Sequence, residues 1–390
     1  MSRYHSYLNS AVTIIRTYNG DEPLASFLKK YFSQHKKYGS KDRKFVSHLC
    51  YCYFRLGKAL QEVSVEEKIL IALFLCSNEA NELLQELRPE WNDKVRYSLQ
   101  DKFLLVGNQF SPEDIFYWQN DLSESIDKAA FTLSHLQQPD LFLRIRPGKE
   151  ELVKGKLSKT DIEFEVTNAD CITLPNSSKI DELIELDKEA VVQDNSSQRV
   201  GEFLKDLKNQ TSKIKLSVWD CCAASGGKSI MAKDILGDID LTVSDVRESI
   251  LINLKKRFSL AGIKNYRSLV ADLKMPVKEL AGKKFDLIIA DVPCSGSGTW
   301  SRTPEQLCFF EEKKIEEYAE LQKKIISNLT THLQPDGCLL YITCSVFSKE
   351  NEEVIAFLKE KFHLELIRME LLKGYFNKAD TMFAALLKKN

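Results

Sequence analysis

The stretch 218–228, VWDCCAASGGK, places the tightest limit on how this chain folds. It begins inside a short β-favouring run, KLSVW, and leads into KSIMAKDIL, which is typical of the start of a helix. Gly226 and Gly227 predict a tight turn that lets a ligand approach the backbone and that places amide groups at a helix N-terminus. A strand, a glycine turn and a helix are the unit of doubly wound α/β domains, in which such a turn occurs with or without a nucleotide.

Strands and helices alternate from about residue 190 onward, which predicts a parallel sheet covered on both faces. Further strands are expected at LTVSD, SLVADL, FDLIIAD and CLLYITCS, and ADTMFAALLKK is expected to form a terminal edge strand. The GxGxxG spacing of dinucleotide sites is absent, which argues against nicotinamide and flavin enzymes. Because ligands bind at the carboxyl ends of the strands in such sheets, polar residues there are the first site candidates. They are Asp245, Asp272, Asp291, Cys294 and Cys344.

Composition limits the class of protein. A chain of 390 residues, 43% hydrophobic and 28% charged, is long enough for two or three domains with their own cores. It contains no apolar run near the roughly 20 residues of a membrane span, and its first residues do not resemble a secretory signal. Ten cysteines without a CxxC pair indicate reduced thiols and no zinc site. We expect a cytoplasmic monomer without membrane contact or a resident metal ion.

The net charge of −1 conceals a basic N-terminal segment. Residues 1–60 contain eleven Lys or Arg and three Asp or Glu, a local balance of +8. Such a segment suits contact with a polyanion, because neutralised phosphates release counterions. A solvated helix face is the alternative explanation of the same charges.

Hydrophobic periodicity divides the chain into three regions. Residues 1–135 show helical spacing, with little Pro or Gly and no strand alternation, which predicts an all-α domain. Residues 136–190 contain LFLRIRP, KEELVKGKL and FEVTNADCITLP, expected as strand, helix and strand of a small α+β linking module. Residues 191–390 form the α/β domain. Arg144 and Arg146 of the middle module are candidates for contact with a polyanion or for solvated arginines at a strand edge.

Two aspartates at strand ends suit an adenosine ligand. An acid after the second strand, about 25 residues beyond the first, is expected to accept hydrogen bonds from ribose hydroxyls, which makes Asp245 a candidate. Asp272 follows the third strand, where a carboxylate can accept from an adenine amino group. Either residue is equally suited to cap the next helix, so both interpretations stay open.

Cys294 and Cys344 differ from the other cysteines in their position. DVPCSG follows one buried strand and TCS closes the next, so both thiols are expected in loops beside the adenosine-type site. Most free cysteines are inert core residues, but partial exposure and local dipoles lower the pKa of a thiol. A thiolate beside a methyl donor indicates methylation of cytosine at carbon 5. Addition of the thiolate to carbon 6 makes carbon 5 nucleophilic, and after transfer the carbon 5 proton leaves and the enzyme is eliminated.

Taken as a set, DCCAASGGK, DVPCSGSGTW and YITCSVFSKENEEV resemble the RNA cytosine-5 methyltransferases of the RsmB/NSUN family, which bind S-adenosylmethionine. The resemblance covers about 190–390 and includes VVQDNSSQRVGEFL before the first strand. Over 1–135 it is looser and concerns the NusB-like helical RNA-binding domain, with YGSKDRKFVSHLCYCYFR as the most similar piece. The resemblance implies a Rossmann-like methyltransferase domain with a mostly parallel seven-stranded sheet, and RNA as the partner.

The resemblance also implies roles for individual residues. Cys344 would be the nucleophile and Cys294 would assist product release, although spacing alone leaves this order open and DNA cytosine methyltransferases resemble the opposite assignment. Asp291 would hydrogen-bond the polar edge of the pyrimidine, and Lys228 would lie near the target base or the methionine end of the cofactor. The implied cofactor-binding residues are Cys222, Ala223, Ala224, Ser225, Gly226, Gly227, Lys228, Asp245, Arg247, Asp272 and Asp291.

One residue departs from the family pattern, because Ser225 stands where the family usually has proline. Serine keeps the turn possible but removes the φ restraint of the pyrrolidine ring. A weaker cofactor site or a more mobile loop is therefore expected.

Three functions follow from these features. The first is an RNA cytosine-5 methyltransferase, with ribosomal RNA as the expected substrate and transfer RNA as the alternative. The second is an RNA scaffold that binds the cofactor without turnover, and the third is a methyltransferase of another acceptor, such as protein or DNA. The sequence DVPC argues against amino-group methyltransferases, whose corresponding loop usually reads Pro-Pro-aromatic. The presence of both cysteines favours the first function.

Overall fold

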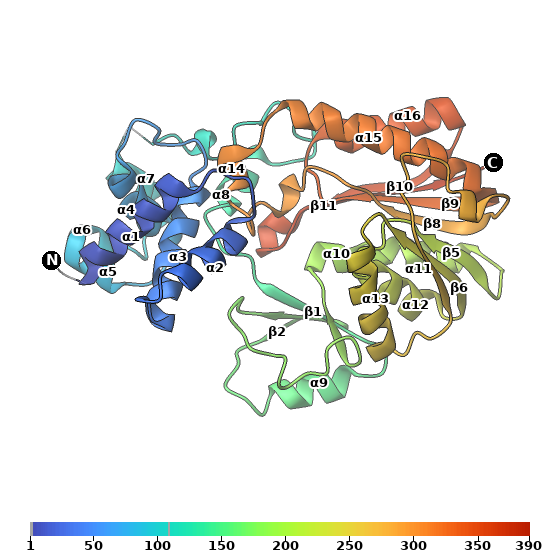
Figure 1. Cartoon of the computed structure of the whole chain (residues 1–390), viewed down its shortest axis with the longest axis horizontal. Coiled ribbons are helices and arrows are strands. Elements are labelled where there is room, and N and C mark those ends of the chain that lie inside the picture. The colour runs from blue at the N-terminus through green and yellow to red at the C-terminus, as the bar shows by residue number, and fades with distance from the viewer. Residues whose placement is uncertain (1–2, 108–109) are drawn as a thin grey trace. The chain divides into compact units, whose positions relative to one another are not determined.

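The computed structural model describes residues 3–107 and 110–390, which fold into two compact units (Figure 1). The first unit is helical and comprises residues up to 120, 127–138 and 299–312. The second unit comprises 121–126, 139–298 and 313–390, and it holds both sheets.

The helical unit is built around α4, in which every residue from Ile69 to Leu75 is buried. Ser64 caps this helix, because its Oγ accepts a hydrogen bond from the backbone N of Glu67 at 3.2 Å. The helices of this unit are α1 Arg3–Thr17, α2 Leu24–Gln34, α3 Ser40–Arg55, α4 Val65–Cys76, α5 Glu82–Leu87, α6 Pro89–Asn92, α7 Leu99–Val106, the 3-10 helix η1 Pro112–Ile115, α8 Lys128–Ser134 and α14 Gln306–Phe309.

A segment from the C-terminal half of the sequence completes the core of the helical unit. The ring of Phe309 packs edge-on against Tyr18, with 5.3 Å between the centroids. Glu305 Oε1 accepts a hydrogen bond from the backbone N of Leu24 at 3.0 Å. Gly20 leaves room for Phe309, since an added Cβ would lie 2.6 Å from its ring. Residues 299–312 are therefore part of this unit although they follow DVPCSGSG in the chain.

The small sheet has four antiparallel strands in the order β2-β3-β1-β4. They are β1 Leu141–Ile145, β2 Glu165–Asn168, β3 Cys171–Leu174 and β4 Ala190–Val192, and α9 Glu150–Leu157 packs on them. We call residues 141–192 the four-stranded module. FEVTNADCITLP, expected as one strand, forms the hairpin β2–β3, because Asn168 Oδ1 accepts from the backbone N of Asp170 at 3.1 Å and turns the chain.

The large sheet has seven strands in the order β10-β11-β9-β8-β5-β6-β7. The five from β5 to β9 run parallel, and β11 is antiparallel to both of its neighbours, so the expected mostly parallel sheet is confirmed. The strands are β5 Leu216–Asp220, β6 Ile239–Asp245, β7 Tyr266–Val270, β8 Phe285–Asp291, β9 Leu333–Thr343, β10 Glu365–Leu372 and β11 Met382–Lys388.

Helices cover both faces of this sheet. Figure 1 shows α15 and α16 on one side and α11, α12 and α13 on the other. The helices are α10 Asn195–Arg199, α11 Gly201–Gln210, α12 Gly227–Leu236, α13 Glu248–Leu260, α15 Lys313–Leu329 and α16 Glu352–Phe362. Short 3-10 helices are η2 Lys278–Leu280, η3 Ser297–Thr299, η4 Thr330–His332, η5 Ser348–Glu350 and η6 Gly374–Asn377.

The prediction of a terminal edge strand was wrong. The last strand, β11, lies between β9 and β10, and six of its seven residues are buried. A continuous apolar run such as MFAALLK is the pattern of a central strand. The edge is formed by β10, which the sequence analysis missed because its ELIRMELL pattern mixes charged and apolar residues without clean alternation.

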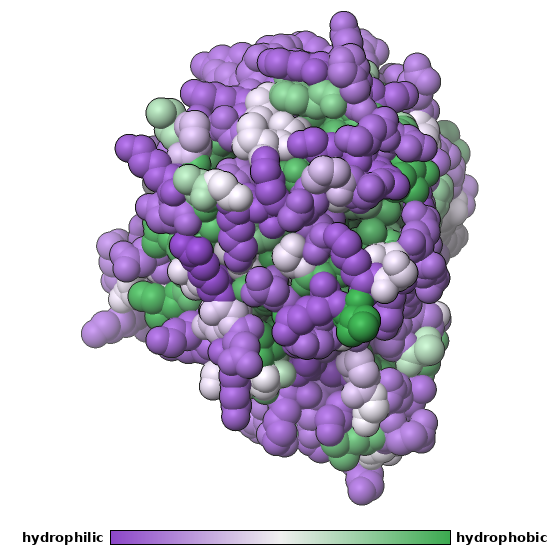
Figure 2. All heavy atoms as spheres, turned by 90° about the vertical axis from the view of Figure 1, so that its right-hand side faces the viewer, coloured by the Kyte–Doolittle hydropathy of each residue, from purple (hydrophilic) through white to green (hydrophobic). Residues whose placement is uncertain are grey.

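The strand order reverses at the carboxyl ends of β5 and β8, and we call the region beside these ends the crevice. The chain moves from β5 outward through β6 to β7 and then returns to β8 on the opposite side of β5. Ligands of doubly wound sheets bind at such a reversal. Figure 2 shows a face on which hydrophilic residues predominate and hydrophobic ones are scattered. Within the described residues, the helices are too short or too polar to cross a membrane.

Candidate active site

Two cysteines meet at the carboxyl ends of β8 and β9. These strands are parallel neighbours in which Asp291 pairs with Ile342, so the loops that follow them leave the sheet side by side. Cys294 lies three residues beyond Asp291, and Cys344 lies two residues beyond Ile342. Their Sγ atoms are 3.2 Å apart, and both side chains are partly buried. Both cysteines lie in loops after neighbouring strands, where the sequence placed them.

A buried carboxylate joins the two cysteine loops. Glu350 is fully buried, and its Oε2 accepts from the backbone N of Ser295 at 2.8 Å while its Oε1 accepts from Ser345 Oγ at 2.7 Å. Each of these donors is the residue directly after a cysteine. Burial raises the pKa of Glu350, and the hydrogen bonds from Ser295 and Ser345 act in the opposite direction.

Helix α15 contributes to the same network through Gln322. Its Nε2 donates to Glu350 Oε2 and to the carbonyl of Pro293, each at 3.0 Å. The hydroxyl of Tyr341 donates to Gln322 Oε1 at 3.1 Å and to the carbonyl of Glu350 at 2.6 Å. Because these groups are buried, each hydrogen bond restricts the positions of the loops above them.

The surroundings of Cys294 disfavour the thiolate form of its side chain. The hydrogen bond with Cys344, together with burial and the nearby charge of Glu350, raises the pKa of Cys294 well above its usual value. At 3.2 Å, either sulfur can donate a hydrogen bond to the other.

Lys228 and Asp291 form an ion pair at the centre of the crevice. Lys228 Nζ lies 3.1 Å from Asp291 Oδ2, and it also donates to Ser197 Oγ at 2.7 Å. Lys228 belongs to the first turn of α12, Asp291 ends β8, and Ser197 lies on α10. The side chain of Lys228 is 11% exposed and that of Asp291 is 30% exposed, so the pair faces the crevice with the carboxylate outermost.

The turn between β5 and α12 is held by the end of β6. The backbone N of Ala223 donates to the carbonyl of Ser244 at 2.8 Å, and that of Ala224 donates to Asp245 Oδ2 at 3.0 Å. Ala224 has a φ of +45°, a left-handed conformation that is uncommon for a residue with a side chain. The carboxylate of Asp245 stabilises this conformation by binding the amide of the residue that adopts it.

The two glycines of the turn serve different purposes. Gly226 has a φ of +87°, and a Cβ there would lie 2.6 Å from the ring of Phe258, so this glycine allows close packing against α13. A Cβ at Gly227 would meet no atom within 4 Å. Open space therefore lies beside Gly227, where the first amides of α12 have no acceptor inside the helix. Gly227 therefore has room for the expected close approach of a ligand, whereas Gly226 serves packing.

Asp245, Arg247 and Asp272 lie close together beyond β6 and β7. Asp245 is buried, and its Oδ1 accepts from the backbone N of Arg247 at 2.9 Å and from its Nε at 3.2 Å. The backbone N of Ala271 donates to the carbonyl of Asp245 at 3.1 Å, which brings Asp272 to the same place. Asp272 is exposed, and its Oδ1 accepts from the backbone N of Lys274 at 3.0 Å. The apolar side chain of Val246, 59% exposed, borders this group.

Sequence reasoning did not select Asp220, the most buried acid of the crevice. Its Oδ2 accepts from Ser229 Oγ at 2.6 Å, while Oδ1 is buried and has no hydrogen-bond partner among the residues that the structure describes. Burial raises the pKa of Asp220 to about 7, with a further contribution from the charge of Asp291. Its place at the end of the strand before the glycine turn was a signal that the sequence analysis did not use.

The predicted residues of the cofactor turn, the two cysteines, Lys228 and Asp291 are thus arranged along the carboxyl edge of one sheet. Four further residues around them were missed, namely Ser197, Asp220, Gln322 and Glu350. Ser197 lies in VVQDNSSQRVGEFL and Glu350 lies in YITCSVFSKENEEV, so both fall inside motifs that the resemblance already singled out.

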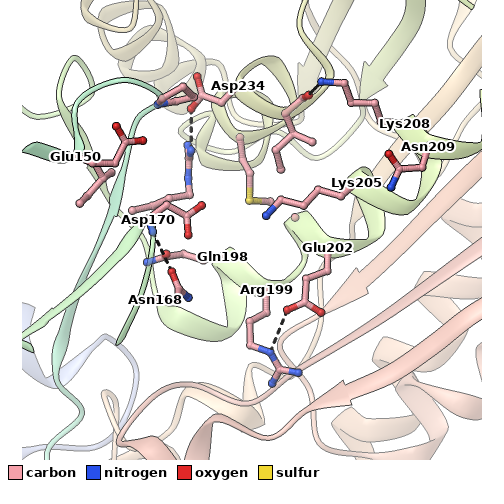
Figure 3. A pocket seen from close by; sticks show the side chains of 16 residues that line it. Glu150, Asn168, Asp170, Gln198, Arg199, Glu202, Lys205, Lys208, Asn209 and Asp234 are labelled. Carbon is pink, nitrogen blue, oxygen red and sulfur yellow. Dashed lines mark hydrogen bonds and ion pairs between the residues drawn. The ribbon is translucent and has the colours of Figure 1, made fainter. Parts of the chain in front are cut away.

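A separate pocket of about 440 Å³ lies between the four-stranded module and the helices α11 and α12 (Figure 3). Its wall carries as many basic as acidic side chains: Arg144, Arg199, Lys205 and Lys208 against Glu150, Asp170, Glu202 and Asp234. The residues that line this pocket do not include the predicted catalytic or cofactor-binding side chains.

Comparison with known sequences identifies relatives of the C-terminal part. A family model described as 16S rRNA methyltransferase RsmB/F matches residues 204–384. The ribosomal RNA small subunit methyltransferase B of Enterobacter sp. (strain 638) is 35% identical over 147 residues, which are 36% of this chain and 33% of that protein. Its counterpart in Proteus mirabilis (strain HI4320) is 31% identical over 166 residues, 42% of this chain and 37% of that protein. The chain thus spans about a third of the length of these relatives.

Comparison with solved structures supports the fold. The crystal structure of PH0851 superposes with a TM-score of 0.71 at 18% identity and covers 100% of both chains. NSun6 from Pyrococcus horikoshii, solved with SFG, gives a TM-score of 0.59 at 15% identity over 70% of this chain and 97% of that one. At these identities the likeness concerns the fold alone.

Proposed function

We propose that the chain is an RNA cytosine-5 methyltransferase of the RsmB/F type that uses S-adenosylmethionine, because a family model described as 16S rRNA methyltransferase RsmB/F matches residues 204–384. Ribosomal RNA is the proposed substrate, because the curated relatives are named for the small ribosomal subunit. The observation that carries the proposal is the 3.2 Å approach of Cys294 and Cys344 at the ends of two neighbouring strands.

The crevice suits S-adenosylmethionine, which supplies an electrophilic methyl group when bound. The buried carboxylate of Asp245 is placed for ribose hydroxyls, and the exposed side chain of Val246 beside it offers an apolar surface for adenine. The open space at Gly227 and the first amides of α12 suit the methionine carboxylate. NSun6, which has the same fold, was solved with an analogue of this cofactor. The remaining predicted residues, Cys222, Ala223, Ala224, Ser225, Arg247 and Asp272, border the same space.

Cys344 is the proposed nucleophile. As a thiolate it forms a bond to carbon 6 of the cytosine, and the electron pair of the carbon 5–carbon 6 double bond becomes available at carbon 5. Carbon 5 forms a bond to the methyl group, whose bond to the sulfonium sulfur of the donor breaks with the electron pair left on that sulfur. The proton on carbon 5 then leaves to a base, the bond from sulfur to carbon 6 breaks, and the double bond is restored. The 3.2 Å contact supports a role for both thiols, because a hydrogen bond from the Cys294 thiol would stabilise a thiolate at Cys344.

Cys294 is the proposed assistant of the release step. The Cys294 sulfur lies 3.2 Å from the Cys344 sulfur, which would carry the adduct. Cys294 would therefore lie close to the cytosine while the cytosine is bound to Cys344. Asp291 would accept from the amino edge of the cytosine, and Lys228 would hold that carboxylate in place through their 3.1 Å contact. Ser197, on the other side of Lys228, fixes the direction of its ammonium group.

The helical unit is the proposed contact for flanking RNA, since the target base must leave its stack to reach the thiols. Nine of the eleven basic residues in 1–60 are exposed, and seven of these lie between Lys29 and Lys44. Arg55 has a different role, because it is buried and donates to the carbonyls of His135 and Gln137.

The test uses total RNA from cells that lack the protein, labelled S-adenosylmethionine, and the wild type beside Cys294→Ala and Cys344→Ala. We expect 5-methylcytosine by mass spectrometry with the wild type, and a protein–RNA band on denaturing gels that accumulates with Cys294→Ala. The double variant should form no adduct. An adduct with Cys344→Ala in place of Cys294→Ala would exchange the two roles, and methyl transfer to protein or DNA alone would refute the function.

The same experiment separates the two RNA substrates. Label in small-subunit ribosomal RNA supports the proposal, whereas label confined to transfer RNA supports the alternative.

A further inference from the structure

The turn that contains Ser225 is held from outside by one arginine. Arg257, on α13, donates from its Nη1 to the hydroxyl of Ser225 at 2.8 Å and to the carbonyl of Ser225 at 3.1 Å. The side chain of Arg257 is 23% exposed, so these contacts are largely shielded from water. A guanidinium that binds both the backbone and the side chain of one residue restricts its orientation.

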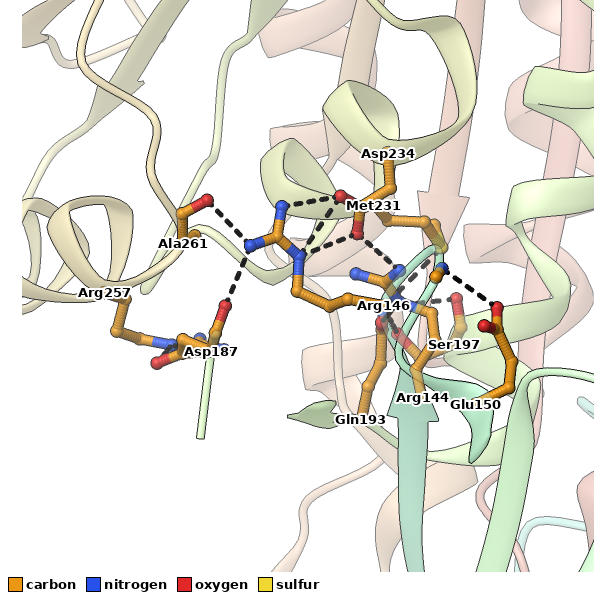
Figure 4. A network of polar contacts seen from close by, with 11 residues as sticks. Arg144, Arg146, Glu150, Asp187, Gln193, Ser197, Met231, Asp234, Arg257 and Ala261 are labelled. Atoms are coloured by element: carbon orange, nitrogen blue, oxygen red, sulfur yellow. Dashed lines mark hydrogen bonds and ion pairs between the residues drawn. The ribbon is translucent and has the colours of Figure 1, made fainter. Parts of the chain in front are cut away.

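Arg257 is in turn fixed by Asp187 of the four-stranded module. Its Nε and Nη2 lie 2.7–3.0 Å from the two carboxylate oxygens of Asp187 in a two-pronged ion pair (Figure 4). Asp187 is buried and has a φ of +65°. Its own backbone is bound on both sides, because its N donates to the carbonyl of Ala190 at 2.7 Å and its carbonyl accepts from Arg146 at 3.1 Å.

The module also holds the far end of the helix that begins at the turn. Arg144 Nη1 and Arg146 Nη2 each lie 2.7 Å from a carboxylate oxygen of Asp234, in the last turns of α12 (Figure 4). Arg144 and Asp234 are each only 6% exposed. The two arginines are therefore neither solvated nor placed for contact with a polyanion, which corrects both expectations from the sequence. The module thus binds the C-terminal part of α12 directly and reaches the turn before α12 through Arg257.

We propose that Arg257 and Asp187 are positioning residues that hold the Ser225 turn in its cofactor-binding conformation. Neither residue is assigned to contact the cofactor. The pair supplies a restraint on Ser225 through hydrogen bonds, at a position where a proline would supply one through its ring. This inference rests on the proposed function, since it assumes that the turn binds S-adenosylmethionine.

An alternative role for Arg257 and Asp187 is only to hold the four-stranded module against α13, and this role predicts different effects of substitution. Loss of the contact between the module and α13 would lower the free energy of unfolding of the second unit, and it would not affect the binding of the cofactor more than the binding of RNA. Loss of positioning raises the KM for the cofactor, leaves kcat and the KM for RNA within about twofold, and increases backbone amide exchange at residues 222–228 in the ligand-free protein. The two roles are therefore distinguishable.

The experiment measures the Kd for S-adenosylhomocysteine by calorimetry on the full chain, with amide exchange on the same samples. Arg257→Met should raise this Kd about 10-fold, because it removes both contacts to Ser225. Ser225→Ala should raise it about threefold, since the carbonyl contact remains. Arg257→Lys should restore part of the affinity. The matched control is Lys256→Met, which removes a positive charge from an exposed neighbour on the same helix and should change the Kd by less than twofold.

Asp187→Asn tests whether the two residues act as one unit. It should raise the Kd for S-adenosylhomocysteine less than Arg257→Met does, and the double variant should match Arg257→Met alone, because Asp187 acts only through Arg257. Additive effects of the two changes would overturn the linked arrangement.

The failures of the two proposals are distinct. A wild-type protein that does not bind S-adenosylhomocysteine refutes the proposed function. A wild type that binds, with a Kd unchanged in Arg257→Met, overturns the positioning role and leaves the function standing. If Arg257→Met does not fold, Ser225→Ala and Asp187→Asn decide, and an unchanged Kd in both overturns the inference.

Discussion

The sulfur atoms of Cys294 and Cys344 lie 3.2 Å apart although 50 positions separate the two residues in the chain. The register of β8 and β9 places the loops that carry the two cysteines side by side. Glu350 accepts a hydrogen bond from each of these loops. Two thiols this close share one environment, so a change in one alters the other.

Mild oxidation should therefore link the two cysteines. Diamide removes two electrons and two protons from the thiols and is itself reduced to the hydrazine, leaving a Cys294–Cys344 disulfide. We expect loss of methyl transfer, recovery with dithiothreitol, and a cross-linked peptide by mass spectrometry. Cys294→Ala is the control and should lack this peptide. A different major disulfide among the ten cysteines would contradict the geometry.

Glu350→Ala should weaken both the fold and the site. The change leaves the buried donors of Ser295, Ser345 and Gln322 without their acceptor, which should lower the free energy of unfolding by about 3 kcal/mol. The cysteine loops should loosen, and we expect methyl transfer to fall at least tenfold. Urea denaturation and initial rates measure the two effects. Glu350→Gln retains one acceptor oxygen and should lose less, so equal losses in both variants would argue against the network.

Strand ends made it predictable that these polar side chains lie together at one edge of the sheet. Asp245, Asp291, Cys294 and Cys344 follow runs whose apolar composition marks strands, and parallel strands bring their carboxyl ends to one edge. The residues that support them were not predictable in this way. Gln322 reaches the cysteine loops only because α15 packs across the sheet, and a helix surface position carries no sign of which loop it will meet.

The errors in the fold have a similar cause. The sheet position of β11 depends on the return of the chain through β10, whose pattern lacks clean alternation. Arg144 and Arg146 alternate as edge residues would, but the partner that buries them, Asp234, comes from a helix about 90 residues away. Pairings of this kind become visible only when the tertiary structure is known.

Asp220 should make stability depend on pH. Its pKa is about 7 in the folded protein and 3.8 in an unfolded chain, so the folded state binds more protons between these values. The contribution of protonated Asp220 to the free energy of unfolding is fully present below about pH 4 and is lost as the pH rises through about 7. Asp220→Asn cannot ionise, so its stability relative to wild type should rise by about 3 kcal/mol from pH 5 to pH 8. Urea denaturation at both pH values tests this, with the exposed Asp240→Asn as the control; the same difference in both variants would refute it.

Gly298 should tolerate no side chain, because it lies where the cysteine loops meet β11. Its N donates to the carbonyl of Cys344 at 2.9 Å, its carbonyl accepts from the N of Thr381 at 2.9 Å, and a Cβ would lie 1.9 Å from the carbonyl oxygen of Thr381. Gly298→Ala must therefore push the loop after Cys294 away from Thr381, which should cost about 1–3 kcal/mol of stability and at least tenfold in methyl transfer. Gly155→Ala is the matched control, since a Cβ there meets nothing within 4 Å and the residue lies inside α9. It should stabilise the protein by about 0.5–1 kcal/mol with unchanged activity, as measured by thermal denaturation and initial rates. A Gly298→Ala variant with wild-type activity would show that the position of the loop after Cys294 does not control catalysis.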